Sequence, residues 1–206
     1  MIFHLVQFLA YIPGKILYPC KIYGRKNLKK GKAILTMNHT SNIDAVNIVL
    51  GTFEKKYFLA KKELFKNKLF GAFIKAMGAI KIDRSAADVG AIKNALKVLK
   101  NDKKLIIFPE GTRNKSDNVE LGEVKSGAAM LAIKSKTPIV PVWVYNRPHA
   151  FRMTKILIGE PYELSQFYGM KITEEVLKDA SEIVSQKLNQ LKEQAEEKFK
   201  KRKKHE

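Results

Sequence analysis

The chain has 206 residues, 45% of them hydrophobic, which is enough for one domain with a substantial core. It carries 39 Lys and Arg residues against 20 Asp and Glu residues, so its formal net charge of +19 must attract a polyanion: nucleic acid, an anionic membrane surface or a phosphorylated substrate. The single cysteine, Cys20, excludes an internal disulfide and fits no metal-ligand spacing, as is typical of a protein from a reducing compartment.

The first 20 residues, MIFHLVQFLAYIPGKILYPC, are mostly apolar but are interrupted. A membrane-spanning helix needs about 20 apolar residues, and the break at Pro13-Gly14 leaves roughly half of that. No Lys or Arg precedes the apolar part and no small-residue cleavage site follows it, so a cleaved signal peptide is not indicated. We expect a kinked helix in the membrane interface, with its apolar side in the acyl region. A helix packed on the protein core is the alternative.

Short apolar and β-branched runs alternate with stretches of helical apolar spacing along the rest of the chain. The runs predict strands at 33–37, 57–60, 79–82, 104–108, 138–145 and 155–159. The helical spacing predicts helices over 63–77, 86–99 and 124–135. This alternation predicts an α/β fold, in which one layered domain has a largely parallel sheet flanked by helices.

The C-terminal segment begins a further helix at Thr173, an N-cap residue type followed by Glu174 and Glu175, where the helix dipole favours acids. Apolar residues as far as Leu191 give this helix a face that docks on the domain. The tail after it is expected to stay unburied; near an anionic leaflet each basic residue contributes up to about 1 kcal/mol, but a merely solubilising terminus fits as well. We therefore expect an interface segment at 1–20, one domain at 21–195 and a basic tail at 196–206.

The stretch NHTSNID places His39 and Asp44 five positions apart, directly after a predicted strand. In a continuous helix the two side chains would lie about 140° apart and could not meet. Thr40, Ser41 and Asn42 are turn and N-cap residue types, so the chain can bend there and bring the imidazole onto the carboxylate. Such a contact suits a general base, because an ordinary histidine pKa is about 6.5. The alternative is that Ser41 or Asp44 only caps a helix.

A second polar motif, FPEGTR, follows the strand predicted at 104–108. Ligands of open α/β sheets bind beyond the carboxyl ends of the strands, so the two motifs are expected to share one crevice. The Arg113 guanidinium is suited to hold a phosphate by two parallel hydrogen bonds. A generic turn with a surface ion pair between Glu110 and Arg113 is the alternative.

Several other chemistries lack their motifs. The chain has no G-x-S-x-G, Walker loop, G-x-G-x-x-G or H-E-x-x-H motif, and Cys20 has no histidine beside it in sequence. A base without an evident protein nucleophile, near residues suited to phosphate, favours direct attack by a substrate hydroxyl.

In this order, NHTSNID and FPEGTR resemble the signature of the glycerolipid acyltransferases, specifically the 1-acyl-sn-glycerol-3-phosphate acyltransferases, which make phosphatidic acid. Residues 61–84, with K-x-E-L near the start and I-D-R at the end, and IVPV at 139–142 are similar to two further family blocks. The resemblance runs from about Ala33 to Val144 and implies an α/β domain with an N-terminal membrane-associated helical piece.

By position, the resemblance implies that His39 is the catalytic base and Asp44 its partner. The positions that resemble the family's substrate-binding residues are Lys61, Arg84 and Arg113 for the phosphate, Glu110 and Gly111 for the acceptor, and Lys125 after the loop. Three positions depart from the family pattern: Lys68 replaces a proline, Asn114 a serine and Val124 a phenylalanine. These departures concern the acceptor pocket and leave the proposed base untouched.

The implied reaction acylates the sn-2 hydroxyl of lysophosphatidic acid from acyl-CoA or acyl carrier protein, with no metal or other cofactor. The expected location is the cytoplasmic face of the cell membrane, on an anionic surface that the net charge of +19 favours. A sister enzyme with glycerol 3-phosphate or another lysophospholipid as acceptor is one alternative, and a thioesterase is another. A non-enzymatic basic module is a third, although no nucleic-acid motif with stacking aromatics accompanies the basic runs, and we expect no nucleic-acid partner.

Overall fold

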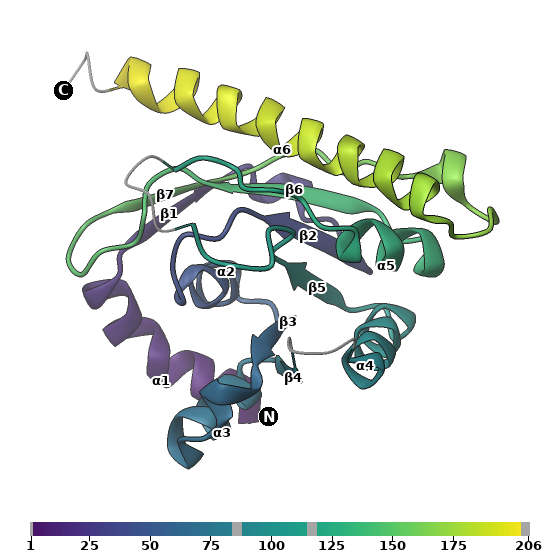
Figure 1. The fold of residues 1–206 in the computed structure, drawn as a ribbon. Coiled ribbons are helices and arrows are strands. Elements are labelled where there is room, and N and C mark those ends of the chain that lie inside the picture. The colour runs from purple at the N-terminus through teal and green to yellow at the C-terminus, as the bar shows by residue number, and fades with distance from the viewer. Residues whose placement is uncertain (1, 84–87, 115–118, 203–206) are drawn as a thin grey trace.

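The computed structural model describes residues 2–83, 88–114 and 119–202. In these residues seven strands form one sheet in the order β1-β7-β6-β2-β5-β3-β4 (Figure 1). The strands are β1 (Cys20–Tyr23), β2 (Ala33–Met37), β3 (Lys56–Lys61), β4 (Ala79–Ile82), β5 (Lys104–Ile107), β6 (Ile139–Val144) and β7 (Thr154–Ile158). Only the β6–β7 pair is antiparallel, so the predicted largely parallel sheet is confirmed.

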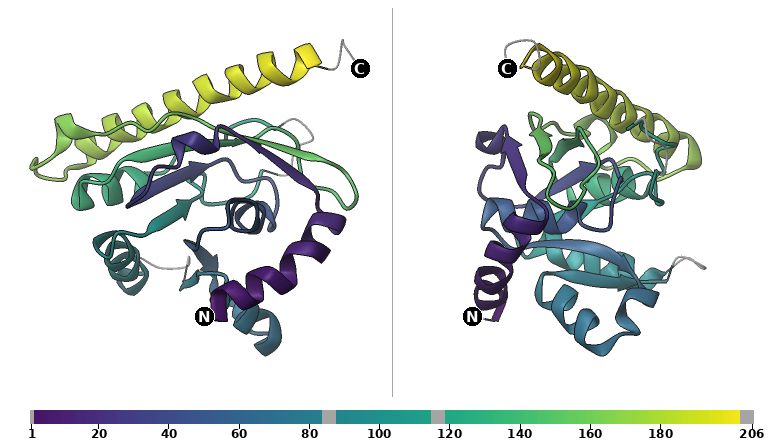
Figure 2. Two further views of the ribbon diagram at one scale, coloured as in Figure 1. Left: turned by 180° about the vertical axis from the view of Figure 1, so that it is seen from behind. Right: turned by 90° about the vertical axis from the view of Figure 1, so that its left-hand side faces the viewer.

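Helices cover both faces of this sheet (Figure 2). They are α1 (Ile2–Leu17), α2 (Asp44–Thr52), α3 (Lys68–Ala76), α4 (Val89–Lys100), α5 (Gly127–Ser135) and α6 (Glu174–Arg202). One core lies between the sheet and the helices α1, α2 and α3, and a second lies between the sheet and α4, α5 and α6. On the central strand β2, Leu35 faces the first core and Ile34 the second, which explains why this strand is a continuous apolar run.

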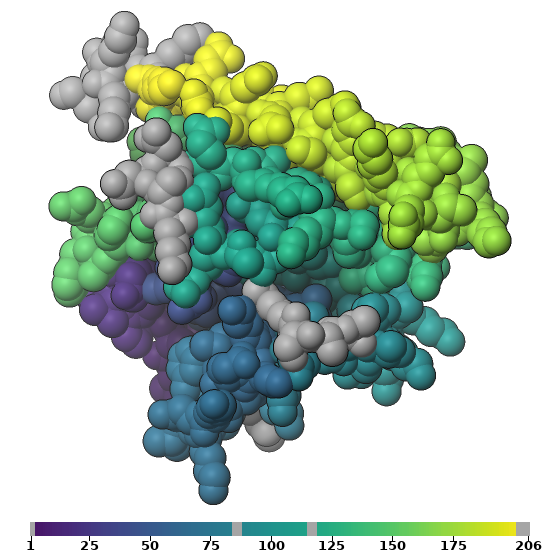
Figure 3. All heavy atoms as spheres, viewed as in Figure 1, coloured from purple at the N-terminus to yellow at the C-terminus, as the bar shows by residue number. Residues whose placement is uncertain are grey.

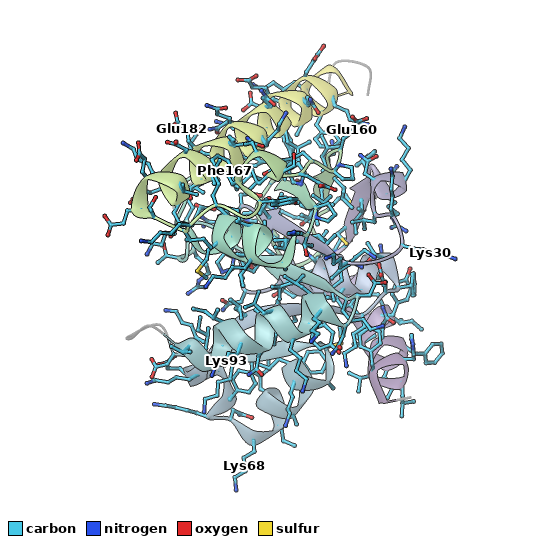
Figure 4. The ribbon with its side chains drawn as sticks, turned by 90° about the vertical axis from the view of Figure 1, so that its right-hand side faces the viewer. Lys30, Lys68, Lys93, Glu160, Phe167 and Glu182 are labelled. Carbon is cyan, nitrogen blue, oxygen red and sulfur yellow. The ribbon has the colours of Figure 1, made fainter. Side chains whose placement is uncertain are left out.

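Local capping chemistry sets the starts of α3 and α4, and residues 86–87 of the helix predicted at 86–99 lie outside the described residues. The helix expected at 63–77 is a 3-10 turn, Lys62–Phe65, followed by α3, because the Asn67 side chain accepts a hydrogen bond from the Phe70 N–H (3.0 Å) and caps the second piece. Likewise, the Asp88 carboxylate accepts from the Ala91 N–H (2.8 Å) at the start of α4. The exposed side chains of Lys68 on α3 and Lys93 on α4 extend from these helices (Figure 4).

Helix α6 continues to Arg202, and Figure 3 shows it lying along the top of the molecule. The Phe199 side chain is fully buried against Trp143, Leu157 and Leu191. The expectation that the chain is unburied from residue 196 onward is therefore wrong at Phe199. Phe199 follows Leu191 by two helical steps of four, so it extends the apolar face that the sequence prediction ended at Leu191.

Helix α1 has two different faces. On one face Phe3 and Gln7 are buried, and the Gln7 side-chain amide donates to the Val49 carbonyl on α2 (3.0 Å), so part of this helix is packed on the core. The other face carries apolar side chains that are 58–71% exposed: Leu5, Phe8, Leu9, Ile12 and Ile16. Pro13 lies inside the helix, which is continuous from Ile2 to Leu17. No helix among the described residues has the length and apolar character needed to cross a membrane.

Candidate active site

The carboxyl ends of five parallel strands meet at one edge of the sheet, and the polar motifs follow these ends. His39 comes two residues after β2, Glu110 three residues after β5, and Lys61 ends β3. Asp83 follows β4, and Arg84, the next predicted phosphate-binding residue, lies outside the described residues. The predicted crevice beyond the strand ends thus receives both motifs from neighbouring strands, because β2 pairs with β5.

The bend required between His39 and Asp44 is present. Helix α2 begins only at Asp44, and the His39 Nδ1 atom lies 3.1 Å from Asp44 Oδ2. The Asp44 side chain is fully buried and His39 is 9% exposed. The same carboxylate accepts hydrogen bonds from the backbone N–H groups of Thr40 and Ser41, both at 2.7 Å, and from the Thr40 hydroxyl at 3.1 Å. It therefore closes the turn that brings it to the imidazole.

This contact fixes the histidine tautomer. An ionised carboxylate only accepts hydrogen bonds, so the Nδ1 atom of His39 must carry the proton that it shares with Asp44. The Nε2 atom then has a lone pair that can accept a proton from another molecule. A base held in this way by a carboxylate is the arrangement used in general acid–base catalysis.

The FPEGTR motif and the residue after it, Asn114, hold His39 from three sides. The His39 ring stacks on the Phe108 ring, with 3.9 Å between ring centroids. The His39 N–H donates to Glu110 Oε1 (2.8 Å), and the His39 carbonyl accepts from the Asn114 N–H (2.8 Å). Ring and backbone of the histidine are thus both positioned by the second motif.

Glu110, which the resemblance assigns to acceptor binding, uses both carboxylate oxygens within the protein. Its Oε1 accepts from His39 and its Oε2 from the Gly122 N–H (3.0 Å). The residue is buried, and this burial raises the pKa of its carboxyl although the two backbone donors act in the opposite direction. The geometry is that of a positioning residue, which ties the turn at residues 39–44 to the segment at Gly122.

Gly111, in the FPEGTR motif, lies beside Lys125. Gly111 has a φ of 69°, a left-handed conformation that favours glycine, and a Cβ there would lie 3.3 Å from Lys125 Cδ. The Lys125 N–H donates to the Pro109 carbonyl (2.9 Å). Both residues line a hollow of about 280 Å³, whose other walls include apolar side chains at the ends of β3, β4 and β5. Arg113 is exposed.

Two further residues, Asn38 and Asn114, support the site in ways that the sequence did not predict. The Asn38 side chain donates to the Val144 carbonyl (3.1 Å) and accepts from the Val144 N–H (2.7 Å), which continues the pairing of β2 with β6 by one side chain. Asn114, read from the sequence only as a departure from a family pattern, also donates its side-chain amide to the Glu120 carbonyl (2.9 Å). The Asn38 contact depends on a neighbour 106 residues away along the chain, whereas the Asn114 side chain bonds a residue six positions further on.

Comparison with known proteins shows the family of the chain. Residues 19–145 match the family model described as "Acyltransferase". The 1-acyl-sn-glycerol-3-phosphate acyltransferase of Bacillus subtilis is 31% identical over 179 residues, covering 83% of this chain and 87% of that protein. The chain belongs to the acyltransferase family.

Two other relatives extend the comparison. The 1-acyl-sn-glycerol-3-phosphate acyltransferase of Streptococcus pneumoniae is 37% identical to this acyltransferase over 145 residues, covering 66% of this chain and 52% of that protein. The crystal structure of the 1-acyl-sn-glycerophosphate (LPA) acyltransferase PlsC from Thermotoga maritima superposes with a TM-score of 0.66 at 26% identity. That match covers 92% of this chain and 78% of PlsC, so the fold is shared over nearly the full length.

Proposed function

We propose that this acyltransferase moves a fatty acyl group from an acyl thioester to the sn-2 hydroxyl of lysophosphatidic acid and forms phosphatidic acid. The observation that carries the proposal is the buried contact of 3.1 Å between His39 and Asp44 at the carboxyl edge of the sheet. The names of the Bacillus subtilis and Thermotoga maritima relatives support the choice of acceptor.

In the proposed mechanism His39 is the general base and Asp44 its orienting partner. His39 Nε2 takes the proton of the sn-2 hydroxyl while the oxygen attacks the thioester carbonyl carbon. The tetrahedral intermediate then collapses, the carbon–sulfur bond breaks, and the imidazolium returns the proton to the leaving thiolate. Asp44 stabilises the imidazolium that forms between these steps. A thioester is already activated for attack, so the proposed transfer needs no metal or other cofactor.

The acceptor phosphate would be held by basic residues at the same edge. Lys61, Arg113 and Lys125 are exposed there, and cations of this kind bind phosphate by charge-assisted hydrogen bonds. The neighbouring hollow of about 280 Å³ has apolar walls, which suits a lipid. We extend the phosphate-binding assignment to Arg84 from the sequence resemblance alone.

We further propose that the protein works at an anionic membrane surface on the cytoplasmic side. The exposed apolar face of α1 suits insertion among acyl chains, because its members recur at helical spacing on one side. The net charge of +19 adds attraction to anionic lipids. Stable interfacial binding requires two such contributions together, here the apolar face of α1 and the positive charge.

The decisive experiment follows thiol release and phosphatidate formation in detergent micelles, from acyl-CoA and from acyl carrier protein, with and without lysophosphatidate. We expect both products to require lysophosphatidate and to disappear in His39→Ala. His4→Ala, which removes an exposed histidine of α1, is the matched control and should stay active.

Other outcomes of this experiment would support one of the alternative functions. Thiol release without an acceptor would indicate a thioesterase, and acylation of glycerol 3-phosphate or another lysophospholipid in place of lysophosphatidate would indicate a sister acyltransferase. A His39→Ala protein as active as wild type would overturn the proposed base. Salt-sensitive DNA binding by a protein without transfer activity would point to the basic binding module.

A further inference from the structure

A second, larger hollow of about 630 Å³ lies on the α6 side of the sheet, and the proposed chemistry leaves it unassigned. Its walls come from the segment after β6, from residues 119–120 and from the last turns of α6. Its aromatic and basic side chains are Tyr145, Arg147, His149, Arg152 and Lys200. It is thus polar, rich in cations and partly aromatic, unlike the apolar hollow beside Lys125.

This α6-side pocket is linked to the catalytic turn by two consecutive hydrogen bonds. The Arg147 Nη2 group donates to the Asn114 carbonyl (3.0 Å), and the Asn114 N–H donates to the His39 carbonyl (2.8 Å). Arg147 also lies only three residues beyond Val144, which pairs with the Asn38 side chain next to His39. A molecule bound against Arg147 is therefore connected through Asn114 to the backbone of His39.

The charge of the pocket is positive. Its two carboxylates are already paired with lysines of α6, Glu196 with Lys200 (2.8 Å) and Glu120 with Lys192. Among the described lining residues there are thus three cationic side chains, Arg147, Arg152 and Lys200, and two carboxylates, Glu120 and Glu196. Guanidinium groups are well matched to phosphate oxygens, to which they donate two parallel hydrogen bonds.

The pocket also lies on the side from which a water-soluble molecule would arrive. The sheet separates α1, with its exposed apolar face, from α6, and the two helices lie on opposite sides of it in Figures 1 and 2. When α1 rests on a membrane, the α6 side faces water. The lipid acceptor comes from the membrane, whereas the carrier of the acyl donor is soluble.

We propose that the α6-side pocket binds the phosphate-bearing carrier portion of the acyl donor. Coenzyme A and acyl carrier protein both present the thioester on a phosphopantetheine arm, so the phosphate of that arm is the shared chemistry. The inference rests on the proposed function, because only that function makes the bound carrier an acyl donor. The binding of the carrier itself can be measured without turnover.

The first test titrates coenzyme A, 4′-phosphopantetheine and holo acyl carrier protein into the full chain by calorimetry. In Arg152→Gln and in the double variant Arg152→Gln/Lys200→Gln, we expect the Kd to rise about tenfold for each lost phosphate contact. If the variants bind 4′-phosphopantetheine more weakly than wild type does, the pocket contacts the phosphate of the arm. If only the binding of coenzyme A is weakened, the pocket contacts the nucleotide phosphates. Lys178→Gln makes the same charge change at the other end of α6, on an exposed position, and should leave the Kd unchanged.

The second test separates this inference from the proposed function. In steady-state assays the Arg152→Gln variant should raise the donor KM about tenfold while the lysophosphatidate KM and kcat stay near wild type. A donor Kd and KM no more affected than in Lys178→Gln would overturn the inference, and so would a rise in the acceptor KM instead. If wild type transfers no acyl group from either donor, the proposed function fails, and the titrations still decide whether the pocket binds the carrier.

Discussion

The substitution Glu110→Gln separates a positioning role from acceptor binding. In the structure the two carboxylate oxygens accept from the His39 N–H at 2.8 Å and from the Gly122 N–H at 3.0 Å. Glutamine offers one oxygen, and its NH₂ group would face the second N–H as donor against donor. Either the buried His39 N–H or the less buried Gly122 N–H must then lose its partner, and the turn at residues 39–44 or the segment at Gly122 must shift.

The size of the effect follows from these contacts. A hydrogen bond to a charged group contributes about 1.5–3 kcal/mol, and an unpaired buried donor costs about 1–3 kcal/mol. Burial raises the pKa of the Glu110 carboxyl, so the neutral amide recovers part of this loss. We expect the free energy of unfolding to fall by about 2–3 kcal/mol. Because a displacement of about 1 Å at a reacting group can cost a factor of about 100, kcat should fall about 100-fold.

The assay is steady-state thiol release with donor and lysophosphatidate varied separately, accompanied by denaturant unfolding. The matched control is Glu123→Gln, an exposed glutamate one residue after Gly122, which should resemble wild type in both measurements. Refutation would be a normal kcat together with a lysophosphatidate KM raised tenfold or more. That result would place the Glu110 carboxylate on the acceptor, as the sequence resemblance implies.

Three further predictions test other parts of the molecule. Asp44→Asn should lower kcat by about 10²–10⁴-fold, because the amide no longer favours a proton on Nδ1, and near-normal turnover would contradict this. Burial lowers the pKa of Lys56 to about 8, whereas in the unfolded chain this pKa is about 10.5. The unfolded state therefore binds more protons between these pH values, and the free energy of unfolding of wild type, compared with Lys56→Met, should rise by up to about 3 kcal/mol from pH 8 to 10.5. Parallel pH profiles of the two proteins would contradict this. Phe8→Ser/Ile12→Ser should weaken co-flotation with anionic vesicles about tenfold or more per side chain, and Val89→Ser on α4, a similarly exposed site, should not.

Much of the fold could be predicted because buried parallel strands need continuous apolar runs. The run at 33–37 coincides with β2, and the runs at 104–108 and 138–145 exceed β5 and β6 by one residue or two. The missed strand is β1, a short edge strand that pairs only with β7 and alternates buried and less buried residues. Its pairing partner lies more than 130 residues away, so no local pattern indicates it.

The candidate site was predictable for a related reason. Parallel strands bring their carboxyl ends to one edge, so motifs that follow two such strands must approach each other once β2 and β5 pair. The contact between His39 and Asp44 was predicted, but the contacts around it were not. They use backbone N–H groups of Gly122 and Asn114 and the side chain of Asn38, and backbone donors have no sequence signature.

The two interpretations of Asp44, proposed catalytic partner or local structural residue, do not exclude each other in this structure. Its Oδ2 atom accepts from the backbone N–H groups of Thr40 and Ser41 and also contacts the His39 ring. The carboxylate that closes the turn is the same group that contacts the imidazole, so the bend places the His39 ring beside Asp44. The motif from His39 to Asp44 has only six residues and can still be specific. One side chain must both close the turn and contact the imidazole, and few other residue types have two acceptor oxygens on a side chain of this length.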